Sequence, residues 1–155
     1  MLPVTDKLKV LFLCTGNSCR SQMAEGWARH LKDDVMEAWS AGIETHGLNP
    51  RAVAAMAEVG VDIAGHRSTH VDELADIAFD YVVTVCAHAH ESCPVFPGRA
   101  VVVHVGFDDP PALARGATNE DDAMAPYRRV RDEIGAFVAT LPEALDNLAR
   151  RGRGD

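Results

Sequence analysis

One short stretch near the N-terminus limits the possible folds of this chain more than any other. The apolar run VLFLC at 10–14 leads directly into Thr-Gly-Asn, and apolar residues at helical spacing follow from Met23 to Leu31. A short run that is apolar throughout is typical of a strand buried on both faces of a parallel sheet. We therefore predict a strand, a loop and a helix in direct succession.

Three further β-rich stretches, at 36–41, 81–85 and 100–105, bring the number of predicted strands to four. A helix is expected between Asn49, which is a good N-cap, and Gly60, with Pro50 at its first position. Strands that alternate with helices indicate an α/β fold with a mainly parallel sheet covered on both faces.

The C-terminal third is predicted to be helical, with an apolar stripe from Tyr127 to Leu148 that bends or ends near Pro142. Before it, residues 107–122 contain two prolines, a glycine and many acids without any period, so we expect a mobile lid there. The basic residues at 150–153 are interpreted as part of a frayed, solvated tail at 150–155, and not as a nucleic-acid contact.

Length and charge narrow the class of protein further. A chain of 155 residues with 47% hydrophobic residues fits a single domain, 1–155. The net charge of −8 argues against a nucleic-acid partner, because neutralising phosphates needs a basic face. No apolar run approaches the ~20 residues that cross a bilayer, and no secretory signal is visible. We expect a cytoplasmic protein without a membrane partner.

The loop after the first strand has the features of an oxyanion site. Cys14 ends the strand, and Arg20 follows six positions later where the helix begins. Backbone N–H groups of such a loop and the first helical turn converge on a tetrahedral oxyanion, and the same field favours a thiolate over a thiol. We predict Cys14 as nucleophile, Arg20 as a bidentate anion ligand and Ser21 as a hydroxyl bonded to the Cys14 sulfur. The predicted substrate-binding residues are Thr15, Gly16, Asn17, Ser18, Cys19 and Arg20.

The alternative is that Cys14 is an ordinary buried thiol at a strand end and Arg20 a surface residue. The combination of strand, glycine, arginine at the sixth position and helix favours the oxyanion site.

The motif Cys-x5-Arg-Ser resembles the phosphate loop of low-molecular-weight protein tyrosine phosphatases. The longer string CTGNSCRSQMAEGW, together with SAGIETHG, GFDDP and RRVRDEI, resembles the thioredoxin-coupled arsenate reductases of that superfamily. The resemblance covers nearly the whole chain. It implies a four-stranded parallel sheet of order 2-1-3-4 flanked by helices, which agrees with the pattern of predicted elements.

A second thiol pair, Cys86 and Cys93, follows the third predicted strand. Hydrolysis of a phosphate ester needs one thiolate and an acid, whereas reduction of arsenate to arsenite needs two electrons, which two thiols supply by forming a disulfide. The resemblance implies that Cys14 attacks arsenate, Cys86 attacks Cys14 and releases arsenite, and Cys93 closes a Cys86–Cys93 bridge. Thioredoxin would then reduce that bridge, and no tightly bound cofactor is implied.

The resemblance also implies that Asp109 is the general acid, since it precedes Pro110 in GFDDP. A carboxyl group on a lid can protonate a departing oxygen, although Asp-Pro is also an ordinary turn signal. Asp108 is the less favoured of the two acids. For Cys19, packing at the helix start is favoured over a redox role.

Residues of this chain suggest two metals, zinc and potassium. The cluster Cys86-x-His88-x-His90-x-x-Cys93 lacks the usual spacing of structural zinc ligands, so we expect no zinc there. In some of the resembling reductases a potassium ion lies beside the anion loop, and Asn17, Glu25 and Ser40 stand at its matching positions. The fourth ligand, a carboxylate in that pattern, is Thr69 here. Potassium dependence is therefore left open.

The prediction from the sequence is a thioredoxin-regenerated arsenate reductase that serves arsenic detoxification and has a weak phosphatase side activity. Two alternatives are a tyrosine-phosphate phosphatase of the same fold and a non-catalytic thiol or metal sensor. A further expectation concerns motion: if the segment from Cys86 to Cys93 is wholly or partly helical in the reduced protein, its end Cα atoms lie about 10.5 Å apart. A disulfide needs about 7 Å or less, so closing it would unwind the segment.

Overall fold

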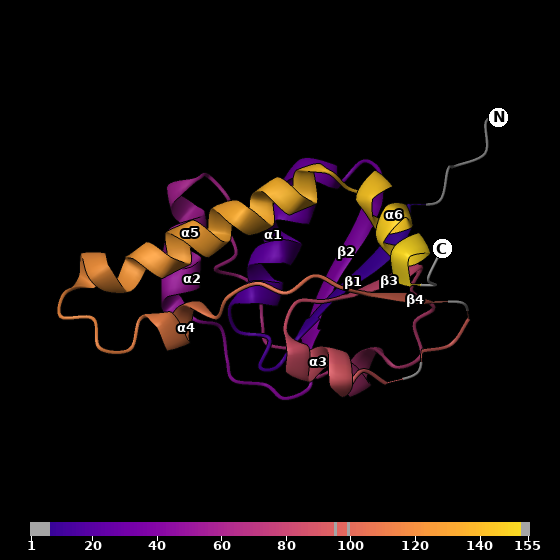
Figure 1. Ribbon diagram of the computed structural model, residues 1–155, viewed down its shortest axis with the longest axis horizontal. Helices are drawn as coiled ribbons and strands as arrows, with labels where there is room; N and C mark the ends of the chain where they lie inside the picture. Colours follow the sequence, from indigo (N-terminus) through magenta and orange to yellow (C-terminus); the bar gives the residue numbers. More distant parts are fainter. Residues whose placement is uncertain (1–6, 95, 99, 153–155) are drawn as a thin grey trace.

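The computed structural model describes residues 7–94, 96–98 and 100–152. Its centre is one parallel sheet with strand order β2-β1-β3-β4, as predicted (Figure 1). The strands are β1 (Leu8–Cys14), β2 (Met36–Gly42), β3 (Tyr81–Thr84) and β4 (Val101–His104). The helices are α1 (Arg20–Lys32), α2 (Pro50–Glu58), α3 (Ala87–Glu91), α4 (Pro110–Leu113), α5 (Glu120–Ala139) and α6 (Glu143–Gly152), with a 3₁₀ turn at Val71–Leu74.

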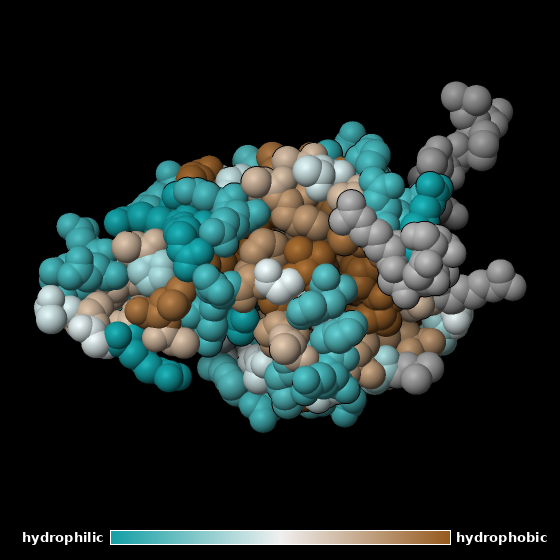
Figure 2. Space-filling model, in the orientation of Figure 1, coloured by the Kyte–Doolittle hydropathy of each residue, from teal (hydrophilic) through white to brown (hydrophobic). Residues whose placement is uncertain are grey.

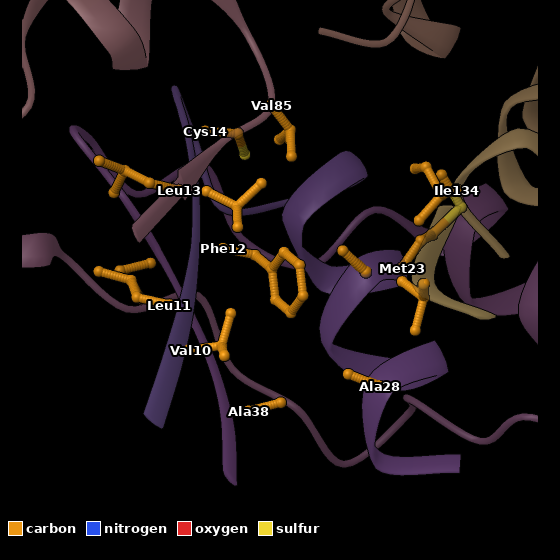
Figure 3. Close-up of a cluster of buried hydrophobic side chains, with 14 of the residues drawn as sticks. Val10, Leu11, Phe12, Leu13, Cys14, Met23, Ala28, Ala38, Val85 and Ile134 are labelled. Carbon is orange, nitrogen blue, oxygen red and sulfur yellow. The ribbon is translucent and has the colours of Figure 1, made fainter. Parts of the chain in front are cut away.

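The buried sheet interior explains why β1 reads as a continuous apolar run. Val10, Leu11, Phe12 and Leu13 are all fully buried, and burial of each such side chain contributes roughly 1.5–3 kcal/mol. Successive side chains leave a strand on opposite faces. Val10 and Phe12 therefore point toward α1, and Leu11 points to the other side of the sheet (Figure 3).

The helices pack on the sheet and on one another. Helix α1 packs on β1 and β2 and is itself covered by the long α5, while α2 packs on α5 and α6 on β4 (Figure 1). The short α3 contacts β1 and β3. In Figure 2, apolar residues gather between α5, α6 and β4, where a pocket of about 310 Å³ is lined by Val105, Phe137 and Leu148 among others.

Predicted helix boundaries are mostly confirmed. Asn49 caps α2 by accepting hydrogen bonds from the N–H groups of Arg51 and Ala52, and Pro50 is the first helical residue. Helix α5 ends at Ala139, before Pro142. Among the described residues, no helix is long and apolar enough to cross a membrane.

The prediction of an irregular lid over 107–122 is wrong in part. Residues 110–113 form α4, with Pro110 at its first position, and α5 already begins at Glu120. Asn119 caps α5, and three acids in the first turn are favoured there by the helix dipole. These exposed turns carry no apolar period, which is why the sequence pattern did not reveal them.

The expected tail also differs from the structure. Helix α6 continues to Gly152, and Arg150 pairs with Asp146 one turn earlier at 3.3 Å. Residues 153–155 lie outside the described part of the chain.

Candidate active site

The loop between β1 and α1 is tied to the rest of the protein by its carbonyl groups. The carbonyls of Thr15, Gly16 and Ser18 accept hydrogen bonds from the backbone N–H groups of Glu44, His46 and Asn49 at 2.7–2.9 Å. That of Asn17 accepts one from the Gln22 side chain. Within the described residues, no backbone N–H from 15 to 19 donates an internal hydrogen bond. Those N–H groups are thus available to a bound oxyanion.

Asn17 gives the loop its sharp turn. Its φ of +48° lies in the left-handed region, which asparagine tolerates better than most residues. The Asn17 side chain is fully buried, and its Oδ1 accepts hydrogen bonds from the Thr69 N–H at 2.7 Å and from Gln22 Nε2 at 3.1 Å. These bonds hold the strained residue in place.

A chain of hydrogen bonds leads from Asn17 to the predicted nucleophile. Asn17 Nδ2 donates to Ser21 Oγ at 2.8 Å, and Ser21 Oγ lies 2.9 Å from Cys14 Sγ. Because the Asn17 amide donates a hydrogen bond to Ser21 Oγ, the hydroxyl hydrogen of Ser21 is free to point at the Cys14 sulfur. A hydroxyl so directed stabilises a thiolate.

Sequence reasoning missed Gln22, which is fully buried at the start of α1. Its Nε2 donates to both Asn17 oxygens and to the Arg67 carbonyl at 2.9 Å. His66 Nδ1 lies 3.0 Å from its Oε1. One signal in the sequence could have identified it: Gln22 is an uncharged polar residue at an inward-facing position of α1.

Arg20 and Asp109 meet at the mouth of the loop. Arg20 donates to the Phe107 carbonyl at 2.9 Å, and its other terminal nitrogen lies 3.6 Å from Asp109 Oδ1. Asp108 is instead paired with Arg129 at 2.9 Å. Asp109 therefore lines the site, and Asp108 does not.

These groups surround a pocket of about 550 Å³. It is lined by Cys14, Thr15, Gly16, Ser18, Cys19, Arg20, His46, Gly47, Leu48, Asn49, Pro50, Asp109, Pro111 and Arg115. In the described part of the chain no Phe, Tyr or Trp lines this pocket.

Cys86 lies beside the anion loop. Strands β1 and β3 are neighbours with Leu13 opposite Thr84, so the segment after β3 runs past the segment after β1. Cys86 Sγ is 3.2 Å from Thr15 Oγ1 and also accepts the N–H of Ala89, which makes Cys86 the N-cap of α3. Its side chain is buried.

Cys93 lies just beyond the opposite end of α3 and is only partly buried. Its thiol donates to the Pro94 carbonyl at 3.5 Å, and burial raises its pKa. All four cysteines are free thiols. The segment between Cys86 and Cys93 is partly helical, over Ala87–Glu91.

Cys19 is buried at the start of α1. Burial raises the pKa of its thiol far above the ordinary value, and the nearby Cys14 raises it further. A thiol with so high a pKa stays protonated, which is unsuited to nucleophilic attack.

The residues at the potassium positions do not fit a cation. Glu25 accepts a hydrogen bond from Ser40 Oγ at 2.5 Å, and its other oxygen is 2.7 Å from Arg29 Nε. The Asn17 oxygen already accepts two hydrogen bonds. An arginine thus neutralises the only carboxylate of the set. Throughout 7–94, 96–98 and 100–152, no three His, Cys, Asp or Glu side chains are grouped as metal ligands.

Comparison with known proteins agrees with this geometry. The family model for low molecular weight phosphotyrosine protein phosphatase matches residues 9–151. A relative from Bacillus subtilis named arsenate reductase is 52% identical over 134 residues, covering 86% of this chain and 94% of the relative. One from Shouchella clausii with the same name is 51% identical over 140 residues, covering 89% and 97%.

Solved structures agree as well. One described as an arsenate reductase in the phosphate binding state superposes with a TM-score of 0.67 at 29% identity, covering 93% of this chain and 98% of that one. An arginine phosphatase from Geobacillus stearothermophilus, at 23% identity and a TM-score of 0.69 with 90% and 94% covered, shares the fold. This chain belongs to the low molecular weight phosphotyrosine protein phosphatase family, and about half of its aligned residues are identical in relatives named arsenate reductase.

Proposed function

We propose that this protein reduces arsenate to arsenite through a relay of Cys14, Cys86 and Cys93 that thioredoxin regenerates. One observation carries the proposal: a second buried thiol, Cys86, lies 3.2 Å from the hydroxyl of Thr15 in the anion loop. Phosphate-ester hydrolysis has no use for that thiol, whereas a two-electron reduction requires it. The relatives named arsenate reductase support the same substrate.

The first step forms a sulfur–arsenic bond. Arsenate binds to the N–H groups of the loop and to the Arg20 guanidinium, and the Cys14 thiolate attacks arsenic. Asp109 donates a proton to the departing oxygen, which leaves as water. Ser21 stabilises the thiolate before the attack.

The second and third steps move two electrons. The Cys86 thiolate attacks Cys14 Sγ, the electron pair of the sulfur–arsenic bond passes to arsenic, and arsenite leaves with a Cys14–Cys86 disulfide behind. The Cys93 thiolate then attacks Cys86 Sγ, which frees Cys14 and leaves a Cys86–Cys93 disulfide. A thioredoxin dithiol reduces that disulfide and is itself oxidised.

Closing the last disulfide changes the fold locally. Cys86 and Cys93 flank α3 at its two ends, and a fully helical path of seven steps of ~1.5 Å would separate their Cα atoms by about 10.5 Å. Because a disulfide spans at most about 7 Å between Cα atoms, we infer that α3 unwinds when the bridge closes. Unwinding exposes the bridge to its reductant.

The test is the amount of arsenite formed per enzyme, with and without thioredoxin, thioredoxin reductase and NADPH. We expect many equivalents with the full system and at most one without it. The variant Cys93→Ser should form one equivalent and stop with a Cys14–Cys86 bridge under both conditions. Sustained turnover by this variant with thioredoxin would exclude the three-thiol relay, and absence of arsenite from wild type would exclude the reductase.

Weak phosphatase activity is the second candidate, favoured by Asp109 beside Arg20 at the same loop. An acid and an anion loop are what ester hydrolysis needs. The absence of Phe, Tyr and Trp from the described lining leaves an aryl phosphate without a ring to stack on. We therefore assign this activity a minor role.

A further inference from the structure

A cluster of three side chains behind the active site has no part in the relay described above. Thr84, the last residue of β3, is fully buried, and its Oγ1 lies 3.1 Å from His90 Nδ1 and 2.9 Å from His104 Nδ1. The two imidazole rings lie 4.8 Å apart between centroids. His90 belongs to α3 and His104 to the end of β4. The cluster thus joins α3 to both strands.

The protons of the cluster can be counted. The Thr84 hydroxyl has one hydrogen, so at least one of the two imidazoles must donate its Nδ1–H to the Thr84 oxygen. Either the second imidazole accepts the threonine hydrogen, or both donate and that hydrogen turns to the Val103 carbonyl at 3.4 Å. Both hydrogen bonds are satisfied in each arrangement.

Little else ties α3 to the sheet. A helix of five residues is too short to be stable by itself. Of its residues only Ala89 is buried, and the other four, His90 among them, are exposed. Among the described residues of α3, the bond from His90 is the one side-chain hydrogen bond to a strand.

We propose that Thr84, His90 and His104 form a latch that stabilises the helical, reduced form of α3 and thereby sets the redox equilibrium of Cys86 and Cys93. His90 lies midway between the two cysteines. If α3 unwinds when the disulfide closes, as inferred above, the latch contacts are made in the dithiol and lost in the disulfide. This inference rests on the proposed function, in which that disulfide is the one thioredoxin reduces.

The latch has two consequences for the relay. It holds Cys86 beside the anion loop in the reduced protein. It also makes the Cys86–Cys93 disulfide easier to reduce, because re-forming the latch favours the dithiol. His90 and Thr84 are positioning residues in this scheme and touch neither substrate nor reacting sulfur.

The test isolates the thiol pair in the full chain with Cys14→Ser and Cys19→Ser, and equilibrates it with reduced and oxidised dithiothreitol. In this reaction the two thiols lose two protons and two electrons to form the disulfide, and oxidised dithiothreitol gains them. We expect Thr84→Val and His90→Phe each to raise the equilibrium constant for oxidation about fivefold, the size expected for a net hydrogen bond. Thr84→Ser, which keeps the hydroxyl, should restore the value of the parent protein.

The matched control is His88→Phe, on the exposed side of the same helix, which should leave the equilibrium constant unchanged. A merely structural role for Thr84 would lower the stability of both redox forms without changing their ratio. An unchanged equilibrium constant for oxidation in both Thr84→Val and His90→Phe would overturn the latch. If Thr84→Val does not fold, the result for His90→Phe alone is decisive. Because arsenate is absent, this result is independent of the arsenite assay: a failed reductase with shifted constants would reject only the proposed function.

Discussion

The anion loop and α3 each carry a cysteine of the proposed relay, yet they are built in opposite ways. The loop accepts hydrogen bonds from the segment 44–49, from Thr69 and from Gln22, and Asn17 and Ser21 are fully buried. Helix α3 is five residues long and is tied to the strands through His90. A thiolate that binds an oxyanion needs fixed donors, whereas a thiol that must exchange partners needs a segment that can move.

The largest effect should come from Cys14→Ser. A serine hydroxyl is not ionised near neutral pH, so arsenate reduction and aryl phosphate hydrolysis should both fall by at least about a thousandfold. Arsenite formation and p-nitrophenol release measure the two activities. Substantial turnover in either assay would move the nucleophile to another residue.

Cys86→Ser should separate the two regions. Arsenate reduction should be lost, while hydrolysis of p-nitrophenyl phosphate should stay within about threefold of wild type because the loop and Asp109 are unchanged. A well-folded variant that loses both activities would show that the loop depends on α3 and that the two regions are not independent.

Arg20→Lys should have an intermediate effect on the fixed region. A lysine keeps the charge but loses the bidentate fork, so sulfate should protect Cys14 from alkylation with about tenfold lower affinity. The rate of Cys14 carboxymethylation across a sulfate titration measures this. Thermal stability should also rise with sulfate in wild type, since a bound anion stabilises the folded state by mass action. Equal protection in both proteins would remove Arg20 from the anion site.

The smallest effect concerns pH. Burial raises the pKa of Cys19 in the folded state above its ordinary value of 9.0, so above that pH the unfolded chain releases a proton that the folded chain keeps. The stabilising contribution is therefore present below pH 9 and is lost as pH rises above it. The free energy of unfolding should fall more steeply in wild type than in Cys19→Ala, by at most about 1.4 kcal/mol per pH unit. Equal slopes in urea titrations would contradict the burial effect.

Much of this molecule could be predicted from local sequence. The run at 10–14 identified the central strand because a strand buried on both faces leaves no polar position, and Asn49 with Pro50 marked a helix start. The strand order and the relay roles of Cys86 and Cys93 came from the resemblance, since no periodicity encodes which strands are neighbours.

What escaped prediction depends on distant contacts. Thr84 meets His104 twenty residues later, and Gln22 meets the Arg67 carbonyl forty-five residues later. The ion pair of Arg29 with Glu25 could have been predicted, because Arg29 follows Glu25 by four positions and such pairs meet on a helix.

The strand order places the segments that carry Cys14 and Cys86 next to each other. In open α/β sheets the crevice at the carboxyl ends of the strands, where the order reverses, is the usual binding place. Here the reversal falls at β1 and β3, and the segments after these two strands carry Cys14 and Cys86. In the proposed relay, the oxyanion-binding thiol Cys14 and the electron-supplying thiol Cys86 thus lie on separate, adjoining segments. A protein with only the anion loop could therefore gain the second thiol through changes in the segment after β3, where Cys86 meets the loop at Thr15.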